Sequence, residues 1–190
     1  MSVLHIDEWP HELITPWSDK VETEKGIPYG ANTFSYTLRL GTYVNMLVNG
    51  QKQEYWLRNH EAITLLPGQT MTASTEEQID VPLDTVVWTA CLDKLSSMGI
   101  QIIPKFMEGG YRGQLTLYII NSGMKPVNLY KGEGIIGLVC EKTSKKKEIA
   151  EKKNGSTSTV ASDFSRQHGL REISRYDATS GIWNKTTDTD

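Results

Sequence analysis

The sequence predicts an all-β domain, and three observations support that prediction. Short β-type runs follow one another closely from residue 26 to residue 140, each bounded by Pro, Gly, Asn or Asp. Residues 34–41 alternate between apolar and polar side chains with a period of two. Asn49-Gly50 is a strong hairpin-turn pair. Short strands at close, regular spacing indicate a distorted β-barrel or a jelly-roll-like sandwich.

The two ends of the chain differ from this middle part. The N-terminal residues are mixed in composition and could hold one short helix, which their prolines would limit. After residue 141 the composition becomes rich in Lys and Glu, then small and polar, and finally apolar and aromatic again. We therefore expect an N-terminal segment (1–25), a barrel (26–141), a charged and polar linker (142–162) and a tail (163–190) that forms a lid or docks on a neighbour.

Composition limits the classes of function. A chain of 190 residues suits one domain with a full core, and its net charge of -3 argues against bulk nucleic-acid binding. Cys91 and Cys140 lie in apolar runs and are expected to be buried, reduced thiols. Trp88 lies inside a β-type run and is expected in the core, while Trp183 could anchor a lid. Without a membrane-length apolar run or a signal-peptide pattern, the chain is expected to be soluble and cytoplasmic.

A glycine-rich stretch precedes one of the predicted strands. Gly109 and Gly110 allow a positive φ or a close backbone approach, so a tight turn is expected there. Glu108, Tyr111 and Arg112 would then lie at the mouth of the turn, where a small anionic ligand could meet them. The alternative interpretation of these residues is an ordinary hairpin with a solvated arginine.

Several stretches, taken in order, resemble the dCTP deaminases and the related dUTPases. These stretches are Ile27-Pro28-Tyr29-Gly30 with Ser35–Arg39, Leu66–Pro82, the glycine turn with the strand that follows it, Tyr130–Gly137, and Arg175-Tyr176 with Gly181. The resemblance implies a homotrimer of distorted barrels, with a nucleotide site at each subunit boundary and Mg²⁺ carried on a bound triphosphate. It also implies deamination without zinc, and this sequence has no Cys-x-x-Cys pair and only scattered histidines.

The sequence departs from the family pattern at the catalytic position. The family strand has an aliphatic residue, a Glu that activates water, two further residues and an Asn, whereas this chain has Leu117-Tyr118-Ile119-Ile120-Asn121. A phenol with a pKa of about 10 is mostly protonated at neutral pH. General base catalysis is worth about two to four orders of magnitude in rate. We therefore expect little deaminase turnover.

The phosphate-binding block is altered as well. Residues 92–98 lack the Gly/Pro-Arg-Ser signature of the family. This leaves Lys94, Ser96 and Ser97 as possible hydrogen-bond donors to a bound phosphate. Glu108 matches the acid that holds the sugar and orients water in dUTPases, although that acid is usually Asp. Weak dUTPase-type hydrolysis through Glu108 is therefore an alternative.

Together these observations predict a catalytically inactive nucleotide-binding protein that sequesters or senses a (deoxy)nucleotide or a nucleotide-derived signal. Phage genomes are one source that would suit such a role. The alternatives are an active dCTP deaminase or dUTPase, and a purely structural or interaction trimer. The candidate binding residues are Lys94, Ser96, Ser97, Glu108, Tyr111, Arg112, Arg175, Tyr176 and Gly181.

Overall fold

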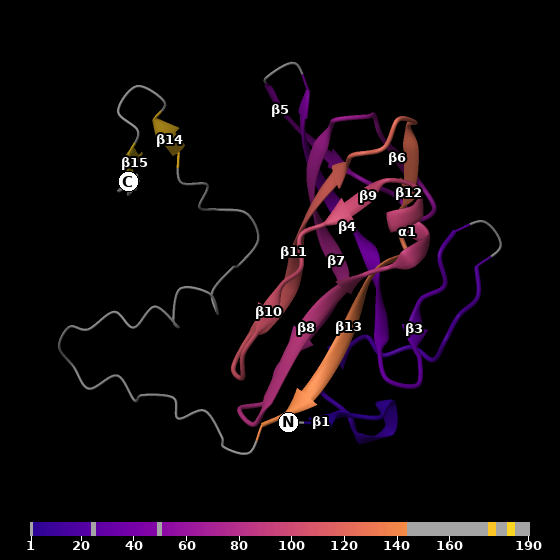
Figure 1. The fold of residues 1–190 in the computed structure, drawn as a ribbon, viewed down its shortest axis with the longest axis vertical. Coiled ribbons are helices and arrows are strands. Elements are labelled where there is room, and N and C mark those ends of the chain that lie inside the picture. The colour runs from indigo at the N-terminus through magenta and orange to yellow at the C-terminus, as the bar shows by residue number, and fades with distance from the viewer. Residues whose placement is uncertain (1, 24–25, 49–50, 144–174, 178–181, 185–190) are drawn as a thin grey trace.

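A strongly curled antiparallel sheet dominates the fold (Figure 1). The structure, a computed structural model, describes residues 2–23, 26–48, 51–143, 175–177 and 182–184. Its elements are β1 (Ser2–Val3), η1 (Ile6–Glu8), β2 (Ile14–Thr15), β3 (Gly30–Ala31), β4 (Tyr36–Val48), β5 (Gln51–Trp56), β6 (Ala62–Leu65), β7 (Thr70–Asp80), β8 (Thr85–Cys91), α1 (Asp93–Ser97), β9 (Ile100–Ile102), β10 (Phe106–Met107), β11 (Arg112–Asn121), β12 (Val127–Tyr130), β13 (Gly134–Lys142), β14 (Arg175–Asp177) and β15 (Ile182–Asn184).

The main sheet runs in the order β10-β8-β13-β4-β7-β11-β9, with β1, β2, β3 and β5 joining it as branches. β6 pairs with β12, and β14 pairs with β15, in two separate two-stranded sheets. The prediction of an all-β, distorted-barrel fold is confirmed, with the main sheet curled into a half-barrel. The predicted hairpin is present as well, because Val48 of β4 lies opposite Gln51 of β5, although Asn49 and Gly50 are outside the described residues.

The hydrophobic core fills the concave side of the curled sheet. On β11 the buried residues Leu115, Leu117 and Ile119 alternate with residues that face outward, as the period of two requires. The N-terminal segment also contributes, because Trp9 and Leu13 are buried in the same core. The short helix expected there is the 3-10 turn η1.

Two sequence predictions about buried side chains need correction. Trp88 is half-buried, because the strand alternates and its neighbours Val87 and Thr89 point into the core. Its ring instead stacks on that of Phe106 with 6.4 Å between centroids. Of the two cysteines, Cys140 is buried as predicted, but Cys91 is only half-buried.

Candidate functional site

The predicted glycine turn is formed by residues 108–111. The amide of Tyr111 donates to the carbonyl of Glu108 at 3.1 Å, and Gly110 has a φ of +90°, which is the geometry of a type II turn. A Cβ on Gly109 would lie 2.7 Å from the Cα of Leu83, so no larger residue fits. Both predicted roles of the glycine pair, a positive φ and a close approach, are therefore present.

Arg112 follows the turn and is held by an acid on the neighbouring strand. Its Nε and Nη2 both donate to Oδ2 of Asp80, the former at 2.8 Å, and Arg112 lies opposite Asp80 in the β11–β7 pairing. The hydroxyl of Tyr111 donates to the carbonyl of Gln114 at 3.0 Å, and burial raises the pKa of Tyr111 to about 12. Glu108 is exposed. Because Asp80 already accepts hydrogen bonds from Arg112, a ligand that binds Arg112 would share the guanidinium with Asp80 or displace it.

Tyr118, the residue that the sequence resemblance places at the catalytic position, projects from the outward face of β11. Its side chain lies between the buried Leu117 and Ile119 in sequence and is 45% exposed. Beyond it, the buried side chain of Asn121 donates to the carbonyls of Leu65 (2.8 Å) and Lys125 (2.9 Å) and accepts from the amide of Gly123 (2.9 Å). Asn121 therefore fixes the end of the strand.

The side chains predicted to donate hydrogen bonds to phosphate lie on the short helix α1. Lys94 Nζ donates to the carbonyl of Gly26 at 2.8 Å, and Ser97 Oγ donates to the carbonyl of Lys94 at 2.8 Å. Ser96 Oγ donates to the carbonyl of Leu92 at 3.3 Å. Each of the three groups is therefore already hydrogen-bonded within the chain, although all three residues are exposed.

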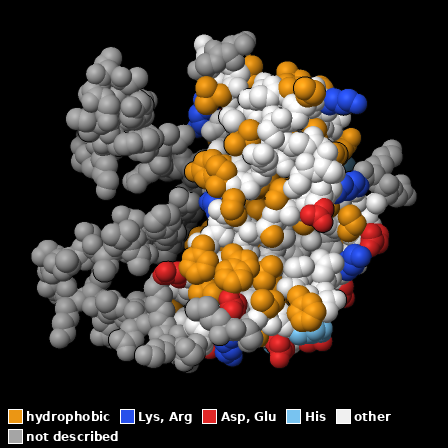
Figure 2. Space-filling model, viewed as in Figure 1, with side chains coloured by type: hydrophobic (Ala, Val, Ile, Leu, Met, Phe, Trp, Pro, Cys, Tyr) orange, Lys and Arg blue, Asp and Glu red, His pale blue; other side chains and the backbone are white. Residues whose placement is uncertain are grey.

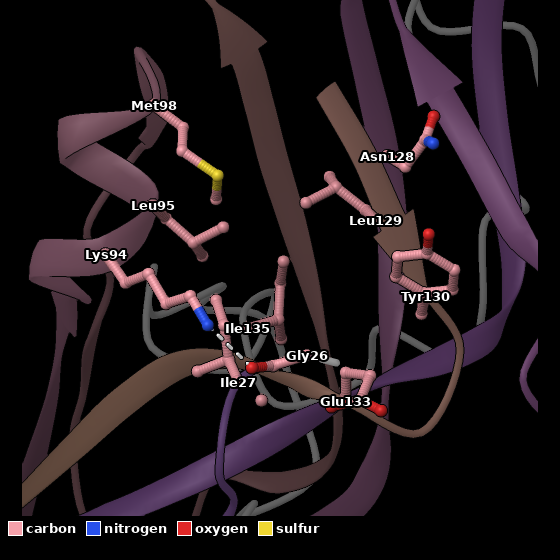
Figure 3. Close-up of a pocket in the computed structure, with 11 residues that line it drawn as sticks. Gly26, Ile27, Lys94, Leu95, Met98, Asn128, Leu129, Tyr130, Glu133 and Ile135 are labelled. Atoms are coloured by element: carbon pink, nitrogen blue, oxygen red, sulfur yellow. Dashed lines mark hydrogen bonds between the residues drawn. The ribbon is translucent and has the colours of Figure 1, made fainter. Parts of the chain in front are cut away.

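A small pocket lies beside Lys94, as Figure 3 shows. Leu95 and Met98 of the α1 region form one wall, and Leu129 and Tyr130 of β12 form the other. Its volume of about 90 Å³ is well below the roughly 300–1,000 Å³ that is typical of small-molecule sites. The pocket is therefore too small to enclose a nucleotide.

The structure does not bring the two groups of candidates together within one chain. Ser122, at the far end of β11, donates through its amide and its hydroxyl to the carbonyl of Gly99, which follows α1. Arg112 starts the same strand, so about 30 Å of strand separates it from the α1 region. Any ligand that touches both groups would have to lie between two copies of the chain.

One residue near Tyr118 was missed by the sequence analysis. Lys105, in the loop between β9 and β10, places its ammonium nitrogen 5.4 Å from the centroid of the Tyr118 ring. It lies thirteen residues away in sequence, and no motif marks it. Only the antiparallel return of the chain, in which Ile103 donates to the carbonyl of Tyr118 at 3.0 Å, brings it close.

Part of the predicted tail site lies in a short two-stranded sheet. Arg175 and Tyr176 lie in β14, where Tyr176 is opposite Trp183 of β15, and Gly181 is outside the described residues. Among the residues that are described, no cluster of three or more His, Cys, Asp or Glu could hold a metal ion. Within the same residues, no helix has the length and apolarity needed to cross a membrane.

Comparisons with known proteins give concordant results. Residues 20–143 match the family model for dCTP deaminase-like proteins. The dUMP-forming dCTP deaminase of Aquifex aeolicus is 28% identical over 137 residues, which cover 67% of this chain and 75% of that protein. The dUMP-forming dCTP deaminase of Methanobrevibacter smithii is 31% identical over 83 residues, or 43% of each protein.

The fold has a counterpart among solved structures. The 2'-deoxycytidine 5'-triphosphate deaminase of Agrobacterium tumefaciens matches with a TM-score of 0.58 and 14% sequence identity, covering 73% of this chain and 47% of that one. The chain thus spans less than half the length of some of these relatives. Because the family model covers more than half of the sequence, the chain belongs to the dCTP deaminase-like family.

Proposed function

We propose that this protein binds a (deoxy)nucleotide or a nucleotide-derived signal in the cytoplasm and sequesters or senses it, with little or no deaminase turnover. The observation that carries this proposal is the pairing at the outward face of β11. There a phenol, Tyr118, stands at the position of the family's catalytic carboxylate, and the ammonium group of Lys105 lies over its ring. A phenol is a much poorer general base for activating water than a carboxylate.

Glu108 does not replace the missing general base at this position. A general base acts within about 3 Å of the proton that it takes, or through one water molecule. Tyr118 lies six residues along β11 from Arg112, roughly 20 Å of strand, and Glu108 lies beyond Arg112 in the turn. The carboxylate of Glu108 therefore cannot reach a nucleobase that contacts Tyr118 of the same chain.

We further propose that the site is completed by neighbouring copies in a homotrimer. The separation of Arg112 from the α1 donors supports a site at a subunit boundary. A second observation is the outward face of β5, β4, β11 and the segment after β9, where register and burial place four exposed large apolar side chains. These are Leu47 (61%), Trp56 (70%), Ile103 (50%) and Tyr118 (45%). Exposed apolar side chains grouped on one face are typical of an association surface.

Mg²⁺ would arrive on a bound triphosphate in this proposal. Mg²⁺ commonly binds through substrate phosphates with only one or two protein carboxylates and several waters. The described residues hold no three-ligand cluster for it, and Asp80 is engaged by Arg112. The donors of this chain would therefore contact phosphate oxygens rather than the ion.

Calorimetric titration against dCTP, dUTP, dTTP, their monophosphates and cyclic nucleotides, each with Mg²⁺, tests the binding proposal. We expect binding of at least one ligand below about millimolar concentration, lost in Arg112→Ala. Ammonia and pyrophosphate release from dCTP and dUTP should stay at background. Turnover that Glu108→Gln abolishes would establish an active enzyme instead, and silence across the panel would favour a purely structural trimer.

A further inference from the structure

The backbone of Lys105 is fixed to the neighbouring strand β8. Its amide donates to Oγ1 of Thr89 at 2.7 Å, and its carbonyl accepts from the amide of Thr89 at 2.9 Å. These two bonds tie the loop between β9 and β10 to β8. The lysine therefore reaches the face of Tyr118 from a fixed point rather than from a free loop, and its Nζ lies 5.4 Å from the ring centroid.

The ammonium group of Lys105 is half-buried and lacks an acidic partner. Among the described residues, no carboxylate lies within ion-pair distance of it, whereas Lys131, another largely buried lysine, contacts Glu76 and Asn59. Burial lowers the pKa of Lys105. A cation–π contact offsets part of the lost hydration of the ammonium, whose N–H donors can still bond to an acceptor on a ligand.

Apolar side chains surround this pair. Ile103, which precedes the loop, is 50% exposed, and Phe106, which follows it, is 58% exposed and stacks on Trp88. Figure 2 shows apolar side chains gathered over the part of this face where β8, β10 and β11 lie in Figure 1. A planar ring could be covered here by apolar and aromatic groups while its edge meets the donors of Lys105 and Tyr118.

We propose that Lys105 and Tyr118 together read the edge of the bound base, and that they select a carbonyl-bearing pyrimidine over an amino-bearing one. This inference rests on the nucleotide-binding function proposed above. A carboxylate at this position could accept a hydrogen bond from the exocyclic amino group of cytosine. A lysine ammonium can only donate, so it pairs with the 4-oxo group of uracil and meets an amino group with no acceptor to offer.

Discrimination follows from the cost of burying donors against donors. Leaving a buried polar group without a partner costs roughly fivefold to 150-fold in affinity. Lys105, which can only donate, therefore disfavours the amino group of cytosine as well as favouring the oxo group of uracil. With Lys105 and Tyr118 at the edge of the base, position 118 would no longer act on an amino group but would hold a pyrimidine that carries a 4-oxo group.

The test compares dUTP and dCTP binding by calorimetry, with Mg²⁺, in the wild type and in Lys105→Met, Tyr118→Phe and Lys125→Met. Lys125 is an exposed lysine in the turn after β11, so its variant controls for the loss of one positive charge. We expect the wild type to bind dUTP at least about tenfold more tightly than dCTP. Lys105→Met should weaken dUTP binding about tenfold and leave dCTP binding unchanged, and Lys125→Met should change neither.

Each other outcome has a definite meaning. If the wild type binds both nucleotides equally, or prefers dCTP, the base-reading proposal fails while nucleotide binding stands. If Lys105→Met weakens both nucleotides to the same extent, the lysine contacts phosphate and the proposal also fails. If neither nucleotide binds the wild type, the base-reading proposal fails, and the proposed function fails only if the wider nucleotide panel is silent as well. Tyr118→Phe keeps the aromatic ring, so an intermediate preference in this variant supports the pair should Lys105→Met not fold.

Discussion

The side chain of Glu77 bridges the backbone and the guanidinium of Arg39 at the point where β4 passes from β13 to β7. Oε1 accepts from Arg39 Nε at 2.6 Å, and Oε2 accepts from the Arg39 amide at 2.9 Å. Glu77 is fully buried, and the Arg39 guanidinium also lies over the ring of Tyr29. The carboxylate thus takes the place of a strand carbonyl where the sheet ladder is interrupted.

We expect Glu77→Ala to destabilise the protein strongly. Removing one partner of a buried ion pair leaves the other charge uncompensated, at a cost of about 3–5 kcal/mol. Chemical denaturation followed by tryptophan fluorescence measures the free energy of unfolding. Asp80→Ala breaks the exposed pair with Arg112 and should leave the midpoint almost unchanged. Equal losses in the two variants would show that burial does not distinguish the pairs.

The same carboxylate predicts a pH dependence. Burial raises the pKa of Glu77, and the bonds and charge of Arg39 offset only part of that effect. A raised pKa means that the folded state holds its proton more tightly than the unfolded state does. The stability contributed by this group is therefore complete below about pH 4.5 and is lost as pH rises through the folded pKa. Relative to Glu77→Gln, the wild type should become progressively less stable as pH rises above about 4.5 in denaturant titrations; a rising difference would contradict this.

The two cysteines should differ sharply in reactivity. Burial raises the pKa of Cys140 to about 12, so at pH 8 only about one thiol in ten thousand is ionised. Cys91 is half-buried; its thiol lies 3.9 Å and 3.8 Å from the carbonyls of Leu92 and Ile100 and accepts from the hydroxyl of Ser96 at 3.3 Å. A thiol reagent that releases a chromophore should titrate one equivalent in the native protein and two in denaturant. The native Cys91→Ser variant should release none, and any release from it would show that Cys140 is accessible.

Restoring a carboxylate at position 118 tests why turnover is expected to be low. Tyr118→Glu supplies a general base, and the expected gain is about two to four orders of magnitude in ammonia release from dCTP. Tyr118→Gln has nearly the same size without the base and should stay at background. If neither variant exceeds the wild type, the altered α1 region, and not residue 118, limits the chemistry.

The proposed assembly predicts a localised effect of charge. Trp56→Glu, on the outward sheet face, should reduce the mass in solution from three chains of 21.4 kDa toward one, as measured by light scattering after gel filtration. Phe34 is exposed to a similar extent (54%) but contacts His5 on another part of the surface. Phe34→Glu should therefore preserve the assembly. A monomeric wild type would rule out this use of the face.

The strands and the glycine turn could be predicted from sequence because their causes are local. A period of two fixes which side chains share a face, and Gly109 and Gly110 are required by a close approach and a positive φ within one turn. Trp88 shows the limit of such reasoning. Its run is apolar on both faces, so sequence alone does not reveal which face of β8 is covered.

The candidate site was less predictable, because its contacts are long-range. Tyr118 was recognised by its place between Leu117 and Asn121, but Lys105 reaches it only through the return of the chain after β9. The sequence also does not show that Asp80 would occupy Arg112, since the two residues meet through strand register. The distance between Arg112 and the α1 donors likewise emerges only when the direction of β11 is known.

The two ends of β11 are anchored independently of the residue between them. Arg112 is tied to Asp80 at one end, and Asn121 joins Leu65, Gly123 and Lys125 at the other. The outward side chain at position 118 contributes to neither anchor. Its identity can therefore change during evolution, or by design, without a matching change in the scaffold, so that the same framework can convert one ligand and merely retain another.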